Sequence, residues 1–276
     1  MKIYMARICP LFSGSSGNAT LIGNRDGYIL IDAGVSCKRL REALSERDVE
    51  LNKIAAIFIT HDHSDHISGL RVFAGSMKVP VFATEQTLSG IESANSMPIG
   101  AQINPLPCNM SSNNYDKSNG VEAAGMGVYS FATSHDTPGS CGFIIETSDH
   151  HRIAVATDMG VVTEGVRRSI TGCDVILLES NYDRAMLEAG GYPYYLKRRI
   201  LSDRGHLCND DCAAELPMLC KSGASRFILG HLSRENNIPA VARQSALCQL
   251  QLSGLSEGLD FMLSVADPSG NGMIIF

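Results

Sequence analysis

The sequence lacks the features that mark membrane, secreted and disordered proteins. None of its apolar runs approaches the roughly 18 residues that a membrane-spanning helix needs. The N-terminal segment MKIYMARICPLFSGSSGN also lacks the apolar stretch of about 7–15 residues found in signal peptides, so we expect no export. The nine cysteines are odd in number and form no CxxC pair, which favours reduced thiols in a cytoplasmic protein. With 44% apolar residues, the 276-residue chain is instead typical of a soluble globular protein.

The chain also lacks an excess of positive charge. It has 23 basic against 29 acidic side chains, so its net charge is 23 − 29 = −6. This balance disfavours broad, nonspecific coating of nucleic acid. A pair of bound divalent cations would add four positive charges that this count does not include. Net charge alone therefore does not exclude a nucleic-acid substrate.

Short apolar segments rich in Ile, Val and Phe alternate with segments of helical periodicity, which is typical of an α/β fold in one large domain, 1–276. We expect strands within 3–8, 18–23, 28–34, 53–60, 79–84, 127–133, 141–147, 152–157, 174–180, 226–231 and 261–266. We expect helices at 37–47, 69–75, 184–201, 210–221 and 241–251, with a kink or early end near Pro217. The polar segment 104–120 predicts an exposed loop that would serve as a flap or internal boundary.

The strongest chemical signal is the sequence HDHSDH at residues 61–66. It follows an apolar run at 54–59 and therefore lies at the end of an expected strand. His61 and His63 are spaced to chelate one metal from a turn, while Asp65 and His66 can reach a second metal nearby. A solvated His-rich loop would have the same composition, but few other chemical needs concentrate these groups so tightly.

Other expected strands end in groups that bind metals or transfer protons. These groups are Asp32, His135, Asp158, Glu179 and His231. Taken singly, each is explained by a helix N-cap, a turn residue or a core histidine. Taken together, they indicate one site, because function in α/β proteins concentrates at strand ends.

With the pattern His-x-His-x-Asp-His at 61–66, the chain resembles the metallo-β-lactamase superfamily over nearly its whole length. The resemblance implies a four-layer αββα sandwich with two divalent metals in a shallow groove at one edge. It implies two sets of metal ligands, namely His61, His63 and His135 for one metal, and Asp65, His66 and His231 for the other.

The resemblance also implies that Asp158 bridges the two metals and that Asp32 orients the ligands from behind without touching metal. Many β-lactamases of this fold have a cysteine where this chain has Asp158. A bridging carboxylate can hold two metals about 3.5–4 Å apart, a spacing suited to in-line displacement at a phosphodiester. Because the donors are nitrogen and oxygen without thiolate, Zn and Mn both fit, and Fe is a further candidate.

Four separate motifs resemble those of the YycJ (WalJ) subfamily. They are FSGSSGN at 12–18, LESN at 178–181, GHLCND at 205–210 and HLSRENN at 231–237. This narrower resemblance implies a nuclease with 5′-to-3′ exonuclease action at DNA ends and a link to DNA repair.

Glu179 and His206 resemble a Glu–His pair that assists the metal centre in the tRNA 3′-processing relatives of this fold. An imidazole oriented by Glu179 could protonate a leaving alkoxide, and such general acid help contributes typically about 10²–10⁴-fold. The catalytic candidates are then Asp65, Glu179 and His206. A structural histidine and a strand-end cap are the alternatives for the last two.

Two further segments each have two interpretations. The FSGSSGN sequence predicts a hairpin turn, in which Ser15, Ser16 and Asn18 either hold a terminal phosphate or have no role beyond the turn. The basic residues at 197–199 with Arg204, and the tyrosines at 192–195, either form a solvated helix face with a Tyr-rich turn, which we favour, or contact a nucleic acid.

The leading hypothesis is a dinuclear metal hydrolase that cleaves phosphodiesters of nucleic acid, most of all at DNA ends. Its rival is a hydrolase of small esters, thioesters or lactones with the same metal centre. A metal-binding sensor or redox module is a third possibility, which the complete ligand set and the Glu–His pair disfavour. The sequence predicts no oligomeric state.

Overall fold

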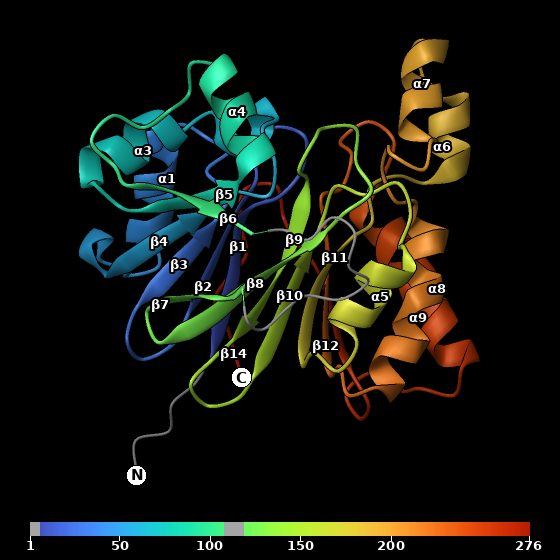
Figure 1. Cartoon of the computed structure of the whole chain (residues 1–276). Coiled ribbons are helices and arrows are strands. Elements are labelled where there is room, and N and C mark those ends of the chain that lie inside the picture. Colours follow the sequence, from blue (N-terminus) through green and yellow to red (C-terminus); the bar gives the residue numbers. More distant parts are fainter. Residues whose placement is uncertain (1–5, 108–118) are drawn as a thin grey trace.

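The computed structural model describes residues 6–107 and 119–276. In this part of the chain the strands form two seven-stranded sheets that pack face to face (Figure 1). Among the described residues, no helix has the length and apolar character needed to cross a bilayer.

The first sheet contains the N-terminal strands and one strand from the C-terminus. Its spatial order is β14 (Ile274–Ile275), β1 (Arg7–Phe12), β2 (Ala19–Gly23), β3 (Tyr28–Ile31), β4 (Ile54–Phe58), β5 (Val81–Thr84) and β6 (Ile103–Leu106). Strands β1 to β3 are antiparallel, and β3 to β6 are parallel. The antiparallel pairing of β1 with β2 confirms the hairpin predicted around FSGSSGN.

The second sheet contains the remaining strands. Its spatial order is β13 (Met262–Val265), β12 (Arg226–Gly230), β11 (Val175–Glu179), β10 (Arg152–Ala156), β9 (Cys141–Glu146), β8 (Met126–Ala132) and β7 (Val121–Ala123). Strands β10 to β13 are parallel, so their carboxyl ends meet at one edge of the sheet.

Helices cover the outer face of each sheet (Figure 1). The first sheet carries α1 (Cys37–Ser45), α3 (Leu70–Met77) and α4 (Glu85–Ser93). The second carries α5 (Glu164–Ile170), α8 (Asn209–Lys221) and α9 (Pro239–Leu252). The short elements are a 3₁₀ turn (Leu51–Lys53), α2 (Ser64–Ile67), α6 (Arg184–Ala189) and α7 (Tyr194–Ile200). The predicted αββα sandwich is confirmed.

The strand sequences explain the three apolar layers. Strands such as β9 and β10 are buried on both faces and are therefore continuous apolar runs, not alternating ones. Ile, Val and Phe from both sheets, including Phe58 and Phe143, form the layer between them. The outward faces of the central strands pack on the helices, so these strands are buried on both sides.

The structure corrects the sequence expectations in the segment 184–201. A single helix was expected there, but α6 ends at Ala189 and α7 begins at Tyr194. Gly190 and Gly191 disfavour helix, and Pro193 restricts the residue before it to extended conformations. In contrast, α8 continues through Pro217, which lies well inside it. Most of the predicted loop at 104–120 lies outside the described residues, and its first residues belong to β6.

Candidate metal centre

The candidate ligands come together at one edge of the sandwich because they follow the ends of four strands that meet there. His61, His63, Asp65 and His66 follow β4, and His135 follows β8. Asp158 follows β10, and His231 follows β12 directly. Six of the eight histidines of the chain, including His206 from the segment between α7 and α8, lie in this cluster.

Three of these residues have a left-handed backbone conformation that is uncommon outside glycine. Asp32, Asp158 and His231 have φ angles of 63°, 59° and 56°. Such conformations persist where the surrounding structure holds them, and they occur often at functional sites. Each turns the chain sharply just after a strand, which carries the side chain over the sheet edge.

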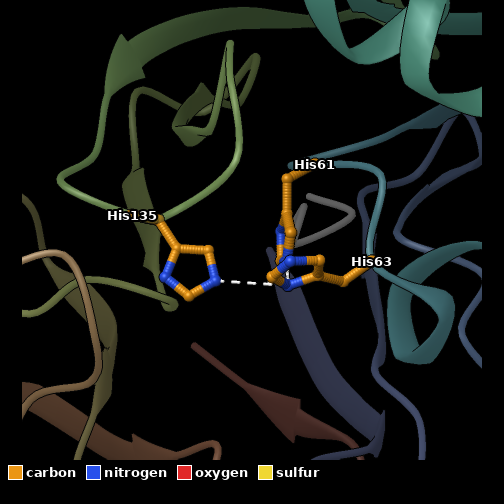
Figure 2. A group of neighbouring side chains, drawn as sticks. All are labelled: His61, His63 and His135. Atoms are coloured by element: carbon orange, nitrogen blue, oxygen red, sulfur yellow. Dashed lines mark hydrogen bonds between the residues drawn. The ribbon is translucent and has the colours of Figure 1, made fainter. Parts of the chain in front are cut away.

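The first group of donor atoms is formed by His61, His63 and His135. Figure 2 shows the three imidazole rings pointing toward one another from the loops after β4 and β8. His63 Nδ1 lies 3.1 Å from His61 Nε2 and 3.3 Å from His135 Nε2. The ring of His135 is fixed from behind, because its Nδ1 donates a hydrogen bond of 3.0 Å to the carbonyl of Gly205.

The second group is formed by Asp65, His66 and His231. Asp65 Oδ2 lies 3.6 Å from Nε2 of His66 and 3.6 Å from Nε2 of His231. Both imidazoles are buried, whereas the carboxylate of Asp65 is partly exposed. The two groups therefore each present three donors, with one side open to solvent.

Asp158 lies between the two groups. Its Oδ2 is 3.4 Å from His66 Nε2, and its Oδ1 is 4.0 Å from His135 Nε2. Oδ1 also lies 3.5 Å from His231 Nδ1, so the carboxylate lies among histidines of both groups. Its role as a bridge between two cations stays a prediction.

Two observations indicate that the donor atoms fit metal ions. Donors around one tetrahedral ion with bonds of about 2.0–2.1 Å lie about 3.3 Å apart, close to the distances within the first group. Asp158 Oδ2 and His231 Nε2 are buried, and neither has a hydrogen-bond partner among the described residues. Because unpartnered buried polar atoms are costly, the site is incomplete without a ligand for them. The structure thus has His and Asp side chains positioned to bind metal ions.

The charges of the cluster shift the pKa values of its histidines. Burial lowers the pKa of His66, but the carboxylates of Asp158 and Asp32 outweigh this effect and raise it to about 9. The pKa of His231 is likewise raised well above its usual value, against the effect of burial, chiefly by Asp158. Burial and the neighbouring His66 lower the pKa of His61 well below its usual value. The carboxylates thus stabilise positive charge beside them. Divalent cations would supply this charge in place of the protons on His66 and His231.

Asp32 supports the ligands without entering either donor group. Its Oδ2 accepts a hydrogen bond of 2.7 Å from His66 Nδ1, and its Oδ1 accepts one of 2.8 Å from the backbone N–H of Thr60. Partners of this kind fix the tautomer and orientation of a metal-binding imidazole. Asp32 thus lies behind His66, and its role in orienting a metal ligand stays a prediction.

Glu179 and His206 form a hydrogen-bonded pair beside the donor groups. Glu179 Oε1 accepts a hydrogen bond of 2.7 Å from His206 Nδ1, and Oε2 accepts one of 2.7 Å from the backbone N–H of Met159. The side chain of Glu179 is fully buried, whereas that of His206 is partly exposed. Asp158, Glu179, His206 and His231 also lie close enough to form a donor group of their own, so the geometry allows His206 either as a proton donor or as a ligand.

The FSGSSGN turn lies against the cluster. The backbone N–H of His231 donates to Ser13 Oγ at 2.8 Å, and the N–H of Asn18 donates to the carbonyl of Asp65 at 2.7 Å. The Asn18 side chain is buried, and its amide lies 2.9 Å from His66 Nε2. Ser15 and Ser16 are instead exposed at the tip of the turn. Their contact with phosphate stays a prediction.

Some residues of the site were missed from the sequence. Asp136 lies 3.4 Å from His63 Nε2 and 3.5 Å from His135 Nε2, and it binds Arg199. Its position directly after His135 was the available signal. Gly34 was missed too, although any side chain there would collide with the carbonyl of Asp65. This close backbone approach holds the loop that carries the ligands against the turn after β3.

The chain was compared with known families, curated proteins and solved structures. The family model "Beta-lactamase superfamily domain" matches residues 28–232. The structure is similar to the metallo-beta-lactamase fold protein YhfI from Bacillus subtilis, with a TM-score of 0.70, 14% identity, and coverage of 99% of this chain and 100% of that one. Fold and family model together define a protein of the beta-lactamase superfamily.

Two curated relatives narrow this assignment. The chain is 33% identical over 258 residues to exodeoxyribonuclease YycJ of Bacillus anthracis, covering 94% of both chains. It is also 33% identical over 258 residues to exodeoxyribonuclease WalJ of Streptococcus pneumoniae, covering 94% of this chain and 93% of that protein. The chain belongs to the beta-lactamase superfamily and, within it, to the same family as YycJ and WalJ.

Proposed function

We propose that this protein is a metal-dependent exodeoxyribonuclease that hydrolyses phosphodiester bonds at DNA ends. The observation that carries the proposal is the pair of three-donor groups joined by the carboxylate of Asp158. The names of the relatives YycJ and WalJ support DNA as the substrate. Digestion from 5′ to 3′ and a role in DNA repair are part of the same proposal.

In this proposal the first and the second donor group would each hold one divalent cation, and Asp158 would contribute a carboxylate to both. The donors are nitrogen and oxygen, so Zn and Mn are the leading candidates, followed by Fe. When bound, such a pair of cations supplies a nucleophilic water at neutral pH and offsets negative charge on the phosphate oxygens. Asp65 is partly exposed, so its carboxylate would help to hold a cation and could accept a hydrogen bond from an attacking water.

The Glu179–His206 pair has the geometry of a general acid. Glu179 accepts a hydrogen bond from His206 Nδ1–H, which fixes the ring and stabilises its protonated form. A proton on Nε2 is then available to the sugar oxygen that leaves when the phosphodiester breaks. The other oxygen of Glu179 is tied to the backbone of Met159, so the carboxylate cannot turn away.

The turn at 13–18 is proposed to receive a terminal phosphate of the DNA. It lies against His231 and Asp65, and the side chains of Ser15 and Ser16 reach solvent beside these residues. Hydroxyls and backbone N–H groups of a glycine-containing turn can bind an anion. A DNA end would then be held with its terminal phosphate beside the bond to be cleaved.

We further propose that residues 1–276 act as one hydrolase domain in the cytoplasm. The two sheets share an apolar layer, which makes a division between them costly. Every cysteine that the structure describes is free, as is typical of a reducing compartment, and Cys108 lies outside the described residues.

The test is a panel of labelled substrates given to protein loaded with Mn²⁺ or Zn²⁺. The panel contains 5′-phosphorylated and 5′-hydroxyl duplexes, single-stranded DNA, RNA, a nitrophenyl phosphodiester, a thioester and a lactone. We expect cleavage of DNA ends at the highest rate, with a rate that depends on the 5′-phosphate. Efficient turnover of the thioester or lactone, without cleavage of any DNA end, would reject the nuclease and favour the small-molecule hydrolase.

A further inference from the structure

The exposed face of α7 carries large aromatic and basic side chains. Tyr194 and Tyr195 are 76% and 74% exposed, whereas aromatic side chains of this size usually bury much of their surface. At 100° per residue, Arg198 follows Tyr194 by one turn and Arg199 follows Tyr195 by one turn, so the four side chains share one face. We call these four residues the α7 face.

The opposite side of α7 is apolar and packed. Ile200 and Leu196 join Leu187 of α6 and Tyr182 in a small core that is separate from the three main layers. In Figure 1 the two helices stand out from the second sheet, at the far end of the molecule from the C-terminus. The α6–α7 unit therefore has its own fixed packing, and the exposure of its tyrosines is not needed for that packing.

The α7 face continues into the metal centre. Arg199 binds Asp136, whose other carboxylate oxygen lies 3.4 Å from His63 and 3.5 Å from His135. Just beyond the helix, Arg204 Nε donates a hydrogen bond of 2.9 Å to the carbonyl of His135. The Arg199–Asp136 pair thus places the α7 face beside the first donor group.

The charge of this segment differs from that of the chain. Residues 192–206 contain four basic side chains and one acidic one, a balance of 4 − 1 = +3 within a protein of net charge −6. Lys197 is occupied, since its Nζ donates to the carbonyl of Glu188. Within the part of the chain that the structure describes, Arg198 is exposed and makes no ion pair.

We propose that the α7 face binds unpaired nucleotides of single-stranded DNA next to the scissile bond, an inference that rests on the proposed nuclease function. Exposed aromatic rings offer stacking platforms for bases. Removal of an aromatic side chain that stacks on a base weakens binding by about 5–100-fold. Arg198 and Arg199 add contacts to the phosphates between those bases. A basic surface alone would need no tyrosines, and a protein-binding surface would need no continuity with the metal centre.

The test measures the Kd of metal-loaded protein for fluorescein-labelled single-stranded DNA with phosphorothioate linkages, which resist cleavage. We expect the double variant Tyr194→Ala/Tyr195→Ala to bind about 10-fold or more weakly. Arg198→Ala should lower the slope of log Kd against log salt by about 0.7, the value for one phosphate contact on a single strand. Leu252→Ala and Arg168→Ala, exposed positions on α9 and α5, are matched controls and should bind as the unmodified protein does.

A strand with abasic sites separates stacking from charge. The unmodified protein should bind the abasic strand more weakly than the intact strand. The tyrosine double variant should bind both strands with the same affinity. If the unmodified protein cleaves DNA but the Kd of the double variant lies within twofold of that of the unmodified protein, the α7 face does not bind the strand and the nuclease function stands. An equal loss on blunt duplex would also overturn the inference, because stacking on unpaired bases would not be the cause. If the unmodified protein neither binds nor cleaves DNA, the proposed function itself fails.

Discussion

At the scale of single residues, the centre depends on atoms that are buried but left without protein partners. Asp158 Oδ2 and His231 Nε2 are such atoms, and both lie at the second donor group, 3.4 Å from His66 Nε2 and 3.6 Å from Asp65 Oδ2 respectively. The carboxylate of Asp158 has a pKa well below its usual range, because the surrounding imidazoles outweigh the effect of burial. It therefore stays ionised and available to cations.

We expect Asp158→Ala to lose at least one metal ion and nearly all turnover. Removal of Asp158 takes away a carboxylate that the proposal shares between both cations, so the loss should exceed the roughly 10–100-fold typical of residues that only support a ligand. Elemental analysis and steady-state kinetics measure the two effects. Asp174→Ala is a suitable control, since Asp174 lies at the opposite end of β11 from the site. Two tightly bound metals in Asp158→Ala would disprove the bridge.

His206→Ala should keep its metals but lose about 10²–10⁴-fold in rate on DNA, because a poor leaving group needs a proton. A nitrophenyl phosphodiester has a good leaving group and should be much less affected. His151→Ala, a histidine outside the cluster, serves as the control and should match the unmodified protein. Loss of metal from the variant, or an equal loss of rate on both substrates, would exclude His206 as the proton donor. His206 would then have a ligand or structural role.

At the scale of elements, strand ends and the turns after them build the site. The parallel strands β10 to β12 end at one edge, and the hairpin of β1 and β2 brings the turn at 13–18 to the same place. Each turn is held by backbone contacts, so a side chain at its tip can change without moving the ligands.

The double variant Ser15→Ala/Ser16→Ala should lose any preference for 5′-phosphorylated over 5′-hydroxyl DNA ends. Both hydroxyls are exposed, so the metal content should stay the same. The ratio of kcat/KM for the two ends is the measurement, and Ser93→Ala on α4 is an exposed serine control. An unchanged ratio, with a clear preference in the unmodified protein, would show that the turn does not read the phosphate.

At the scale of the whole molecule, the metal centre joins the two sheets. Its first ligands follow β4 of the first sheet, and the others follow strands of the second sheet. Cations bound between them therefore crosslink the two halves of the sandwich, and their binding free energy adds to the stability of the fold.

Removal of the metals by a chelator should lower the Tm of the protein. At a free metal concentration about 100-fold above Kd, binding stabilises a fold by about 2.7 kcal/mol, which corresponds to roughly 5–10 °C in a protein of this size. Differential scanning calorimetry before and after chelation measures the shift, and restored Tm on adding metal excludes irreversible damage. Equal Tm values with and without metal would contradict a centre that links the sheets.

The sequence by itself determined the fold class and the chemistry of the site. The run HDHSDH after an apolar strand, and the carboxylates and histidines at the ends of five others, are local patterns that short-range rules can recognise. The strands β6, β7 and β14 were not predicted, because they are short edge strands whose pairing depends on a distant partner. The break between α6 and α7 was also missed, although Gly190, Gly191 and Pro193 were visible.

Only the tertiary structure decided which atoms meet. Asp136 and Gly34 enter the site through contacts with residues far along the chain, such as Arg199 and Asp65, and no local pattern encodes such contacts. The same holds for the α7 face, which the sequence favoured as a solvated helix surface. The Arg199–Asp136 pair places this face beside the metal centre. That contact exists because α7 packs on α6 in a fixed orientation, which the local sequence does not encode.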